Sequence, residues 1–172
     1  MRATIIVAAF FIAGCSAGPK PAAEAGGHGL QGPVEVKTPP LVRMVEFHGH
    51  LGPYVVLGYR AGEAAREILK SPGYFDLDAD VTSPLHTPQS CFIDGVQLGA
   101  GCSVGKRNLT VTEGENVVAS FRSKGGKAVR IDLRPDLPGK LAGWIEKEGV
   151  EAAAHRVLDM PLEEVLDVRL LP

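Results

Sequence analysis

Hydrophobic residues beyond residue 40 first repeat at spacings of three and four, which is the pattern of helices packed by one face. A short apolar helix is predicted over Leu41–Phe47, and a longer one from Pro53 to about Lys70. Ser71–Gly73 is expected to end the second helix. A third helix is predicted over Ser90–Leu98, with Thr87 as its cap and Pro88 in its first turn. The first half of the domain is therefore expected to be mainly helical.

The period changes to two after the loop Cys102–Arg107. Apolar and polar residues alternate in three stretches, Leu109–Val111, Val117–Phe121 and Val129–Leu133. Turn-forming residues separate the three stretches, so an antiparallel meander is predicted. An earlier strand is predicted over Val81–Leu85, where Pro84 favours a position at the sheet edge.

Two further helices are predicted after the strands, over Leu137–Glu148 and around Ala152–Leu158. Helices and strands are thus segregated along the chain rather than alternating. This order favours the α+β class, with helices packed on an antiparallel β-sheet. Gly58 and Gly62 lie one turn apart on the second helix, which indicates either a close contact within the fold or a dimer seam.

The N-terminal residues differ in composition from the rest of the chain. Residues 1–14 are predicted to be a lipoprotein signal peptide, because an apolar run too short to span a bilayer ends in small residues before Cys15. Ile12–Cys15 resembles a bacterial lipobox, and the alternatives are an ordinary cleaved signal peptide or a buried N-terminal helix. Residues 15–40, rich in Gly, Pro and Ala, are expected to form a flexible tether to a domain at 41–172. Lipidated at Cys15, the protein would be extracytoplasmic, anchored at the periplasmic face or the cell surface.

Composition narrows the partners. The chain has 172 residues, of which 45% are hydrophobic and 22% charged, as expected for one globular domain with a real core. Its formal net charge of −2, with no run of Lys and Arg, is untypical of a nucleic-acid-binding protein. We therefore expect no nucleic-acid partner.

The strongest candidate for chemistry is His48-Gly49-His50. Residues two apart point about 200° away from each other on a helix, but to the same side of an extended backbone, which Gly49 permits. His48, His50 and Cys91 are predicted to bind a transition metal, with zinc favoured because imidazole and thiolate suit it. Asp94 and Cys102 are possible further ligands. A catalytic zinc with three protein ligands keeps one position open.

Two alternatives use the same region. A Cys91–Cys102 disulfide is open to an oxidising compartment once Cys15 is lipidated, although on one continuous helix these residues would lie about 16 Å apart. A phosphate-binding loop over Gly99–Lys106 is not favoured, because its glycine spacing is wrong and Arg107 replaces the required Ser or Thr.

Three motifs in order resemble the core domain of the FmdE family of formylmethanofuran dehydrogenase proteins. They are Phe47–Arg60, Cys91–Gln97 and Gly101–Leu109. The resemblance implies an α+β core, usually dimeric, with a histidine and cysteine cluster taken as a metal or active site. The residues it carries over are His48, His50 and Cys91, followed by Asp94, Gln97, Cys102, Lys106 and Asn108.

The chain departs from the family pattern at some positions. Many family members have a cysteine where this chain has Leu51 and a glycine where it has Arg107, and no cysteine follows Cys102. We therefore expect a lipid-anchored, homodimeric FmdE-like protein with a metal site, acting as an accessory or enzyme of one-carbon or redox metabolism. The rivals are a thiol–disulfide redox or small-ligand-binding protein without enzymatic activity, and a structural accessory of a membrane complex. The substrate is left open.

Overall fold

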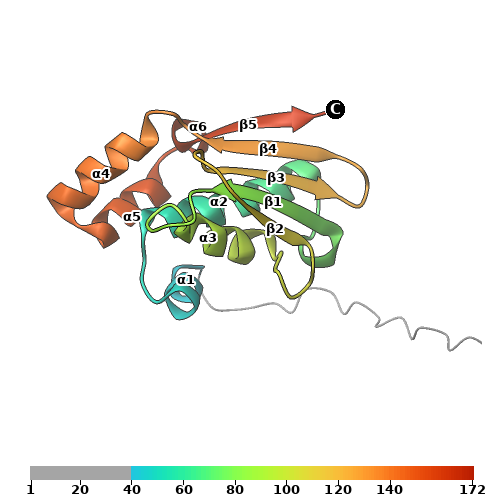
Figure 1. Cartoon of the computed structure of the whole chain (residues 1–172), viewed down its shortest axis with the longest axis horizontal. Helices are drawn as coiled ribbons and strands as arrows, with labels where there is room; N and C mark the ends of the chain where they lie inside the picture. The colour runs from blue at the N-terminus through green and yellow to red at the C-terminus, as the bar shows by residue number, and fades with distance from the viewer. Residues whose placement is uncertain (1–39) are drawn as a thin grey trace, which may run out of the picture. The chain divides into compact units, whose positions relative to one another are not determined.

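A computed structural model describes residues 40–172, which form helices and one five-stranded sheet (Figure 1). The predicted signal peptide, the lipidation site at Cys15 and all but the last residue of the predicted tether lie outside that range. In chain order the elements are α1 Pro40–His48, α2 Pro53–Leu69, the 3₁₀ helix η1 Tyr74–Asp76, β1 Leu77–Ser83, α3 Cys91–Ala100, β2 Leu109–Glu113, β3 Val118–Ser123, β4 Ala128–Leu133, α4 Leu137–Glu148, α5 Val150–Asp159, α6 Leu162–Val165 and β5 Leu166–Leu171. Across residues 40–172, no helix combines the length and apolar character needed to cross a membrane.

The sheet has the strand order β2-β1-β3-β4-β5 and confirms the α+β class. β3 and β4 pair antiparallel as predicted, but β2 pairs parallel with β1, with Ala79 opposite Leu109. The predicted antiparallel meander is therefore wrong at β2. β1 also lies inside the sheet rather than at its edge, because the strand ends at Ser83 and Pro84 follows outside the ladder, where its missing N–H costs no strand pairing.

The helices α2 and α3 cover one face of the sheet, α2 against β3 and β4 and α3 against β1 (Figure 1). Alternate residues of β1 are buried, among them Leu77, Ala79 and Val81. The core lies between this strand face and the two helices, where Phe92 of α3 and Phe121 of β3 are almost fully buried.

Glycines allow α2 and α3 to approach closely. A Cβ atom added to Gly58 would lie 2.0 Å from the carbonyl oxygen of Phe92, and one added to Gly95 would lie 2.1 Å from that of Val55. Gly62 and Gly99 make the same kind of contact. The glycine stripe therefore serves a helix contact within the chain, so the alternative of a dimer seam at this stripe is wrong.

The start of α3 differs from the prediction. Residues 87–90 form a turn, in which the Ser90 N–H donates to the His86 carbonyl oxygen, and the helix begins only at Cys91. Ser90, rather than Thr87, occupies the N-cap position and makes no capping bond with its side chain. As a result, Cys91 lies in the first turn of α3 and Asp94 lies one turn further along.

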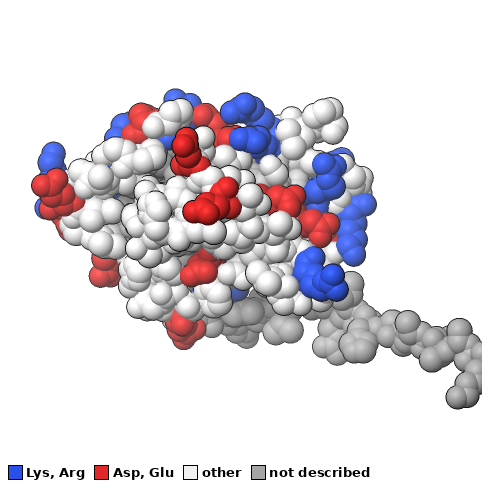
Figure 2. All heavy atoms as spheres, viewed as in Figure 1, with Lys and Arg blue, Asp and Glu red and all other residues white. Residues whose placement is uncertain are grey.

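Charged side chains of both signs are spread over the face shown in Figure 2. Basic side chains gather at the end of the sheet where β3 joins β4, a connection that contains Lys124 and Lys127. Acidic side chains lie beside them and over the middle of this face. Among the residues described, this face shows no continuous basic stripe of the kind that follows a nucleic-acid backbone.

Candidate functional site

His48 is the last residue of α1, and it meets Asp94 of α3. The Nδ1 atom of His48 lies 2.7 Å from Oδ2 of Asp94, while the side chain of His48 is only 9% exposed. A carboxylate accepts from a ring N–H, so the contact favours the tautomer with the proton on Nδ1. The Nε2 atom is buried and has no hydrogen-bond partner among the described residues. His48 therefore presents an unshared Nε2 lone pair.

Asp94 is itself held in place. The Nε2 group of Gln97, one helical turn along α3, donates to Oδ1 of Asp94 at 3.3 Å. Both carboxylate oxygens thus have partners, one on His48 and one on Gln97. Asp94 and Gln97, two of the residues predicted by resemblance, are brought to His48, and their contacts orient its ring.

His50 lies beside His48. The two ring centroids are 4.7 Å apart, with the planes tilted by 39°. Between them Gly49 has a φ of +91°, and its N–H donates to the carbonyl oxygen of Val45. A left-handed φ at this point lets the chain leave α1 and turn the second imidazole toward the first.

Cys91 and His50 line a cavity of about 220 Å³. The other residues around it are mainly apolar, namely Gly52, Pro53, Tyr54, Thr87, Pro88, Ile145 and Val150. Burial, and then the negative charge of Asp94, raise the pKa of the Cys91 thiol. The free protein therefore holds Cys91 as a neutral thiol beside an apolar space.

The three predicted ligands are neighbours but do not form a finished metal centre. Within residues 40–172, no three His, Cys, Asp or Glu side chains are grouped closely enough to hold a metal ion. His48 and His50 lie ring to ring, and His50 and Cys91 share the cavity. The donor types fit zinc, while the distances describe side chains that are not gathered around one point.

The remaining predicted residues lie at the other end of α3, where they hold a loop together. The side-chain amide of Asn108 donates to the carbonyl oxygens of Tyr74 and Leu77, and its Oδ1 accepts from the Ser103 N–H. The ammonium group of Lys106 donates to the Ser103 hydroxyl at 3.2 Å. Asn108 and Lys106 are therefore not part of the histidine site.

Cys102 belongs to this structural end as well. Its thiol is 1% exposed and donates to the carbonyl oxygen of Leu77 at 3.1 Å. Burial raises its pKa to about 12. Both Cys91 and Cys102 are free cysteines, and α3, about 15 Å long at its ten residues, separates them. The structure contradicts the alternative of a Cys91–Cys102 disulfide, because α3 runs straight where the alternative needed the chain to fold back.

Sequence reasoning missed the residues that form the cavity wall. Ile145 of α4 and Val150 of α5 lie far along the chain from the histidines, and Tyr54 follows them at the start of α2. Their apolar character predicts only a helix pattern. No local signal distinguishes an apolar residue in the core from one that lines a cavity.

Comparison with known proteins places these residues in a family. Residues 47–167 match the family profile described as "FmdE, Molybdenum formylmethanofuran dehydrogenase operon". The match begins at Phe47 and so includes all the residues of the histidine site.

Two relatives extend the comparison. The chain is 32% identical over 114 residues to a protein of Archaeoglobus fulgidus named "Probable S-adenosyl-L-methionine-binding protein", a match that covers 64% of this chain and 30% of the relative. The chain thus spans less than a third of that relative's length. A crystal structure of an FmdE-like protein of the tungsten formylmethanofuran dehydrogenase type, from Syntrophus aciditrophicus, matches with a TM-score of 0.55 and 23% identity, covering 76% of this chain and 69% of that one. This likeness shows the fold.

Proposed function

We propose, from the premise that this chain belongs to the FmdE family, that it binds a transition metal through His48, His50 and Cys91. The family profile covers residues 47–167, well over half of the chain. Zinc is the metal that we propose, because two imidazoles and one thiolate suit it and leave one position open.

The observation that carries the proposal is the contact between Asp94 and His48. Histidines that bind metals donate the N–H of one ring nitrogen to a carboxylate and present the other nitrogen to the metal. His48 has the first half of this arrangement at 2.7 Å, and its Nε2 atom is buried without a partner among the described residues. A histidine that served only packing would leave no buried nitrogen unsatisfied.

The chain's own residues would divide the remaining work. His50 lies in a loop between Gly49 and Gly52, and Cys91 in the first turn of α3, so each can supply a donor from a different element. The apolar wall at Ile145 and Val150 restricts water around them. A bound zinc ion would act there as a Lewis acid toward a water molecule or a carbonyl group.

Metal analysis of the full-length protein tests the proposal. Inductively coupled plasma mass spectrometry after zinc loading and desalting should find about one zinc per chain, since one set of three ligands binds one ion. The double variant His48→Ala/His50→Ala and the single variant Cys91→Ala should lose it. His155→Ala removes an exposed imidazole on α5 and should keep it. Equal zinc in wild type and the double variant would reject the site and favour a structural accessory of a membrane complex.

We also propose that Cys15 anchors the protein outside the cytoplasm. The support is the apolar segment that ends at Ile12–Cys15, which resembles a lipobox. Growth with an alkyne-tagged fatty acid should label the wild-type protein and not Cys15→Ala. Labelling that persists in the variant would contradict the anchor.

A homodimer is the assembly that we propose from the family resemblance. The glycine stripe of α2 is occupied by α3, so a second copy would have to contact another surface. Light scattering of the full-length protein should give twice the chain mass of 18.2 kDa. A mass of one chain across the concentration range would reject the dimer.

A further inference from the structure

A second cavity, of about 320 Å³, lies at the end of the sheet where β3 begins and β4 ends. It shares Tyr54 with the His50 and Cys91 cavity, but none of the proposed metal ligands lines it. Its apolar wall includes Val117, Leu133 and Pro138, while charged side chains come from β4, β5 and the segments beside them. At this volume the cavity lies at the lower end of the range for small-molecule sites, about 300–1,000 Å³.

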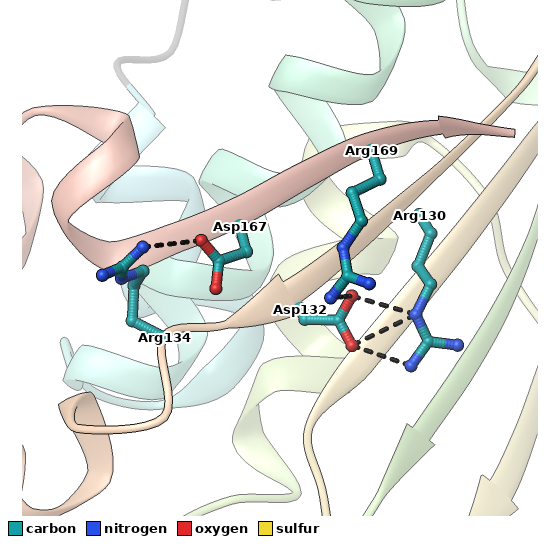
Figure 3. Close-up of polar contacts among 5 residues, drawn as sticks. All are labelled: Arg130, Asp132, Arg134, Asp167 and Arg169. Carbon is teal, nitrogen blue, oxygen red and sulfur yellow. Dashed lines mark hydrogen bonds and ion pairs between the residues drawn. The ribbon is translucent and has the colours of Figure 1, made fainter.

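The charges around this cavity are arranged in an unusual way. In the β4–β5 register Asp132 lies opposite Asp167, and Arg130 lies opposite Arg169. Like charges directly across a strand pair destabilise a sheet. Figure 3 shows how ion pairs offset this, with Asp132 between Arg130 at 2.7 Å and Arg169 at 3.6 Å, and Asp167 paired with Arg134 at 2.8 Å. A sheet selected for stability alone would place opposite charges across the strands.

These ion pairs leave binding capacity unused. Arg134 engages Asp167 through Nη1 and Oδ1 alone, so the remaining guanidinium N–H groups and the second carboxylate oxygen make no side-chain contact among the described residues. Arg169 approaches Asp132 only at 3.6 Å, too far for a hydrogen bond. The side-chain oxygen of Gln89, another residue of the wall, is buried and lacks a hydrogen-bond donor within residues 40–172.

We propose that this cavity binds a small zwitterion with an apolar body, namely a free apolar α-amino acid. Its carboxylate would meet Arg134 and Arg169, its ammonium group would meet Asp167 and the Gln89 oxygen, and its side chain would lie against the apolar wall. A simple anion or cation fits less well, because acidic and basic side chains both line the cavity. The ligand extends the Arg134–Asp167 pair on both sides instead of breaking it.

Isothermal titration calorimetry of the full-length protein with L-leucine, L-methionine and L-phenylalanine tests the proposal. At least one of them should bind at millimolar concentration or below. For that amino acid, the carboxamide lacks the negative charge and the N-acetyl derivative lacks the positive charge. Each should bind about tenfold more weakly, since each loses a charge-assisted hydrogen bond.

Two variants assign the ends of the ligand. Arg134→Gln should weaken the amino acid and its N-acetyl derivative by about fivefold and leave the carboxamide unchanged, because a half-exposed charge is partly screened. Asp167→Asn should weaken the amino acid and the carboxamide and leave the N-acetyl derivative unchanged. The matched control, Glu148→Gln/Arg156→Gln, removes an exposed ion pair between α4 and α5 and should bind as the wild type does.

Absence of binding by all three amino acids at millimolar concentration would overturn the proposal. So would binding that neither variant changes. Circular dichroism checks that each variant is folded, and both substituted side chains are at least one third exposed, so the fold should tolerate the changes. Zinc content reports on the separate histidine site and should be the same in all these variants.

Discussion

The two ends of α3 carry similar residues in different surroundings. At the first end Cys91 borders a cavity and Asp94 holds a histidine whose second nitrogen is buried and unpaired among the described residues. At the other end, the Cys102 thiol and the Asn108 amide donate to backbone oxygens. The first end leaves polar groups free for a ligand, whereas the second uses them to hold the chain. Residue type alone does not separate a site from a support.

The largest expected effect comes from the middle of α3, which positions both ends. Gly95→Ala would place a Cβ atom 2.1 Å from the carbonyl oxygen of Val55, so α2 and α3 must move apart. We expect a loss of about 3 kcal/mol or more in the free energy of unfolding. Urea denaturation measures it. Gly143→Ala, on α4 with open space around it, should be neutral or stabilising, and equal effects of the two substitutions would contradict the close contact.

At the supporting end, Asn108→Ala removes a buried amide that bonds three backbone groups. We expect the free energy of unfolding to fall by about 2–3 kcal/mol, because those groups lose their partners. Zinc content should stay the same. The control Asn116→Ala, at an exposed position, should cost less than about 0.5 kcal/mol. A zinc content that falls with Asn108→Ala would show that the two ends are not separate.

At the ligand-facing end, Asp94→Asn should weaken zinc binding about 10- to 100-fold, the effect of losing a partner that orients a metal-binding histidine. Competition with a zinc-binding dye measures the affinity. Stability should change by less than about 1 kcal/mol, because the Asp94 side chain is 36% exposed. Asp80→Asn, on an exposed position of β1, serves as the control. Unchanged zinc affinity in Asp94→Asn would remove its orienting role.

The smallest effect concerns the Cys102 thiol and its dependence on pH. Its pKa rises from 9.0 to about 12 in the folded protein. Between these values the unfolded chain has released the proton and the folded chain retains it, so stability falls as the pH rises. The advantage of wild type over Cys102→Ala should therefore shrink by up to about 1.4 kcal/mol per pH unit.

Urea denaturation of both proteins at about pH 8 and about pH 10.5 measures this difference. Tyr54 and Tyr59, whose pKa values are also raised by burial, are present in both proteins, so their contribution cancels. A constant difference between the two proteins would contradict a buried, protonated thiol at Cys102.

Local patterns identified most of the helices and missed the order of the strands. The predicted helix at Leu137–Glu148 matches α4, and the prediction from Pro53 to about Lys70 ends one residue beyond α2. Those signals lie within the helices themselves, in apolar spacing and end residues. The parallel pairing of β1 with β2 depends on the route through α3, which the alternation in Leu109–Val111 does not encode.

By itself, the sequence determined that two histidines would lie together, because Gly49 permits the turn between neighbours in the chain. It also indicated the family through its three motifs. Only the tertiary structure decided that Asp94 orients His48, that Cys91 and Cys102 serve different ends of α3, and that Arg134 meets Asp167 beside a cavity. The physical reason is that these contacts join residues far apart in the chain, and the packing of α1 and α2 on α3 and of β4 on β5 brings them within bonding distance.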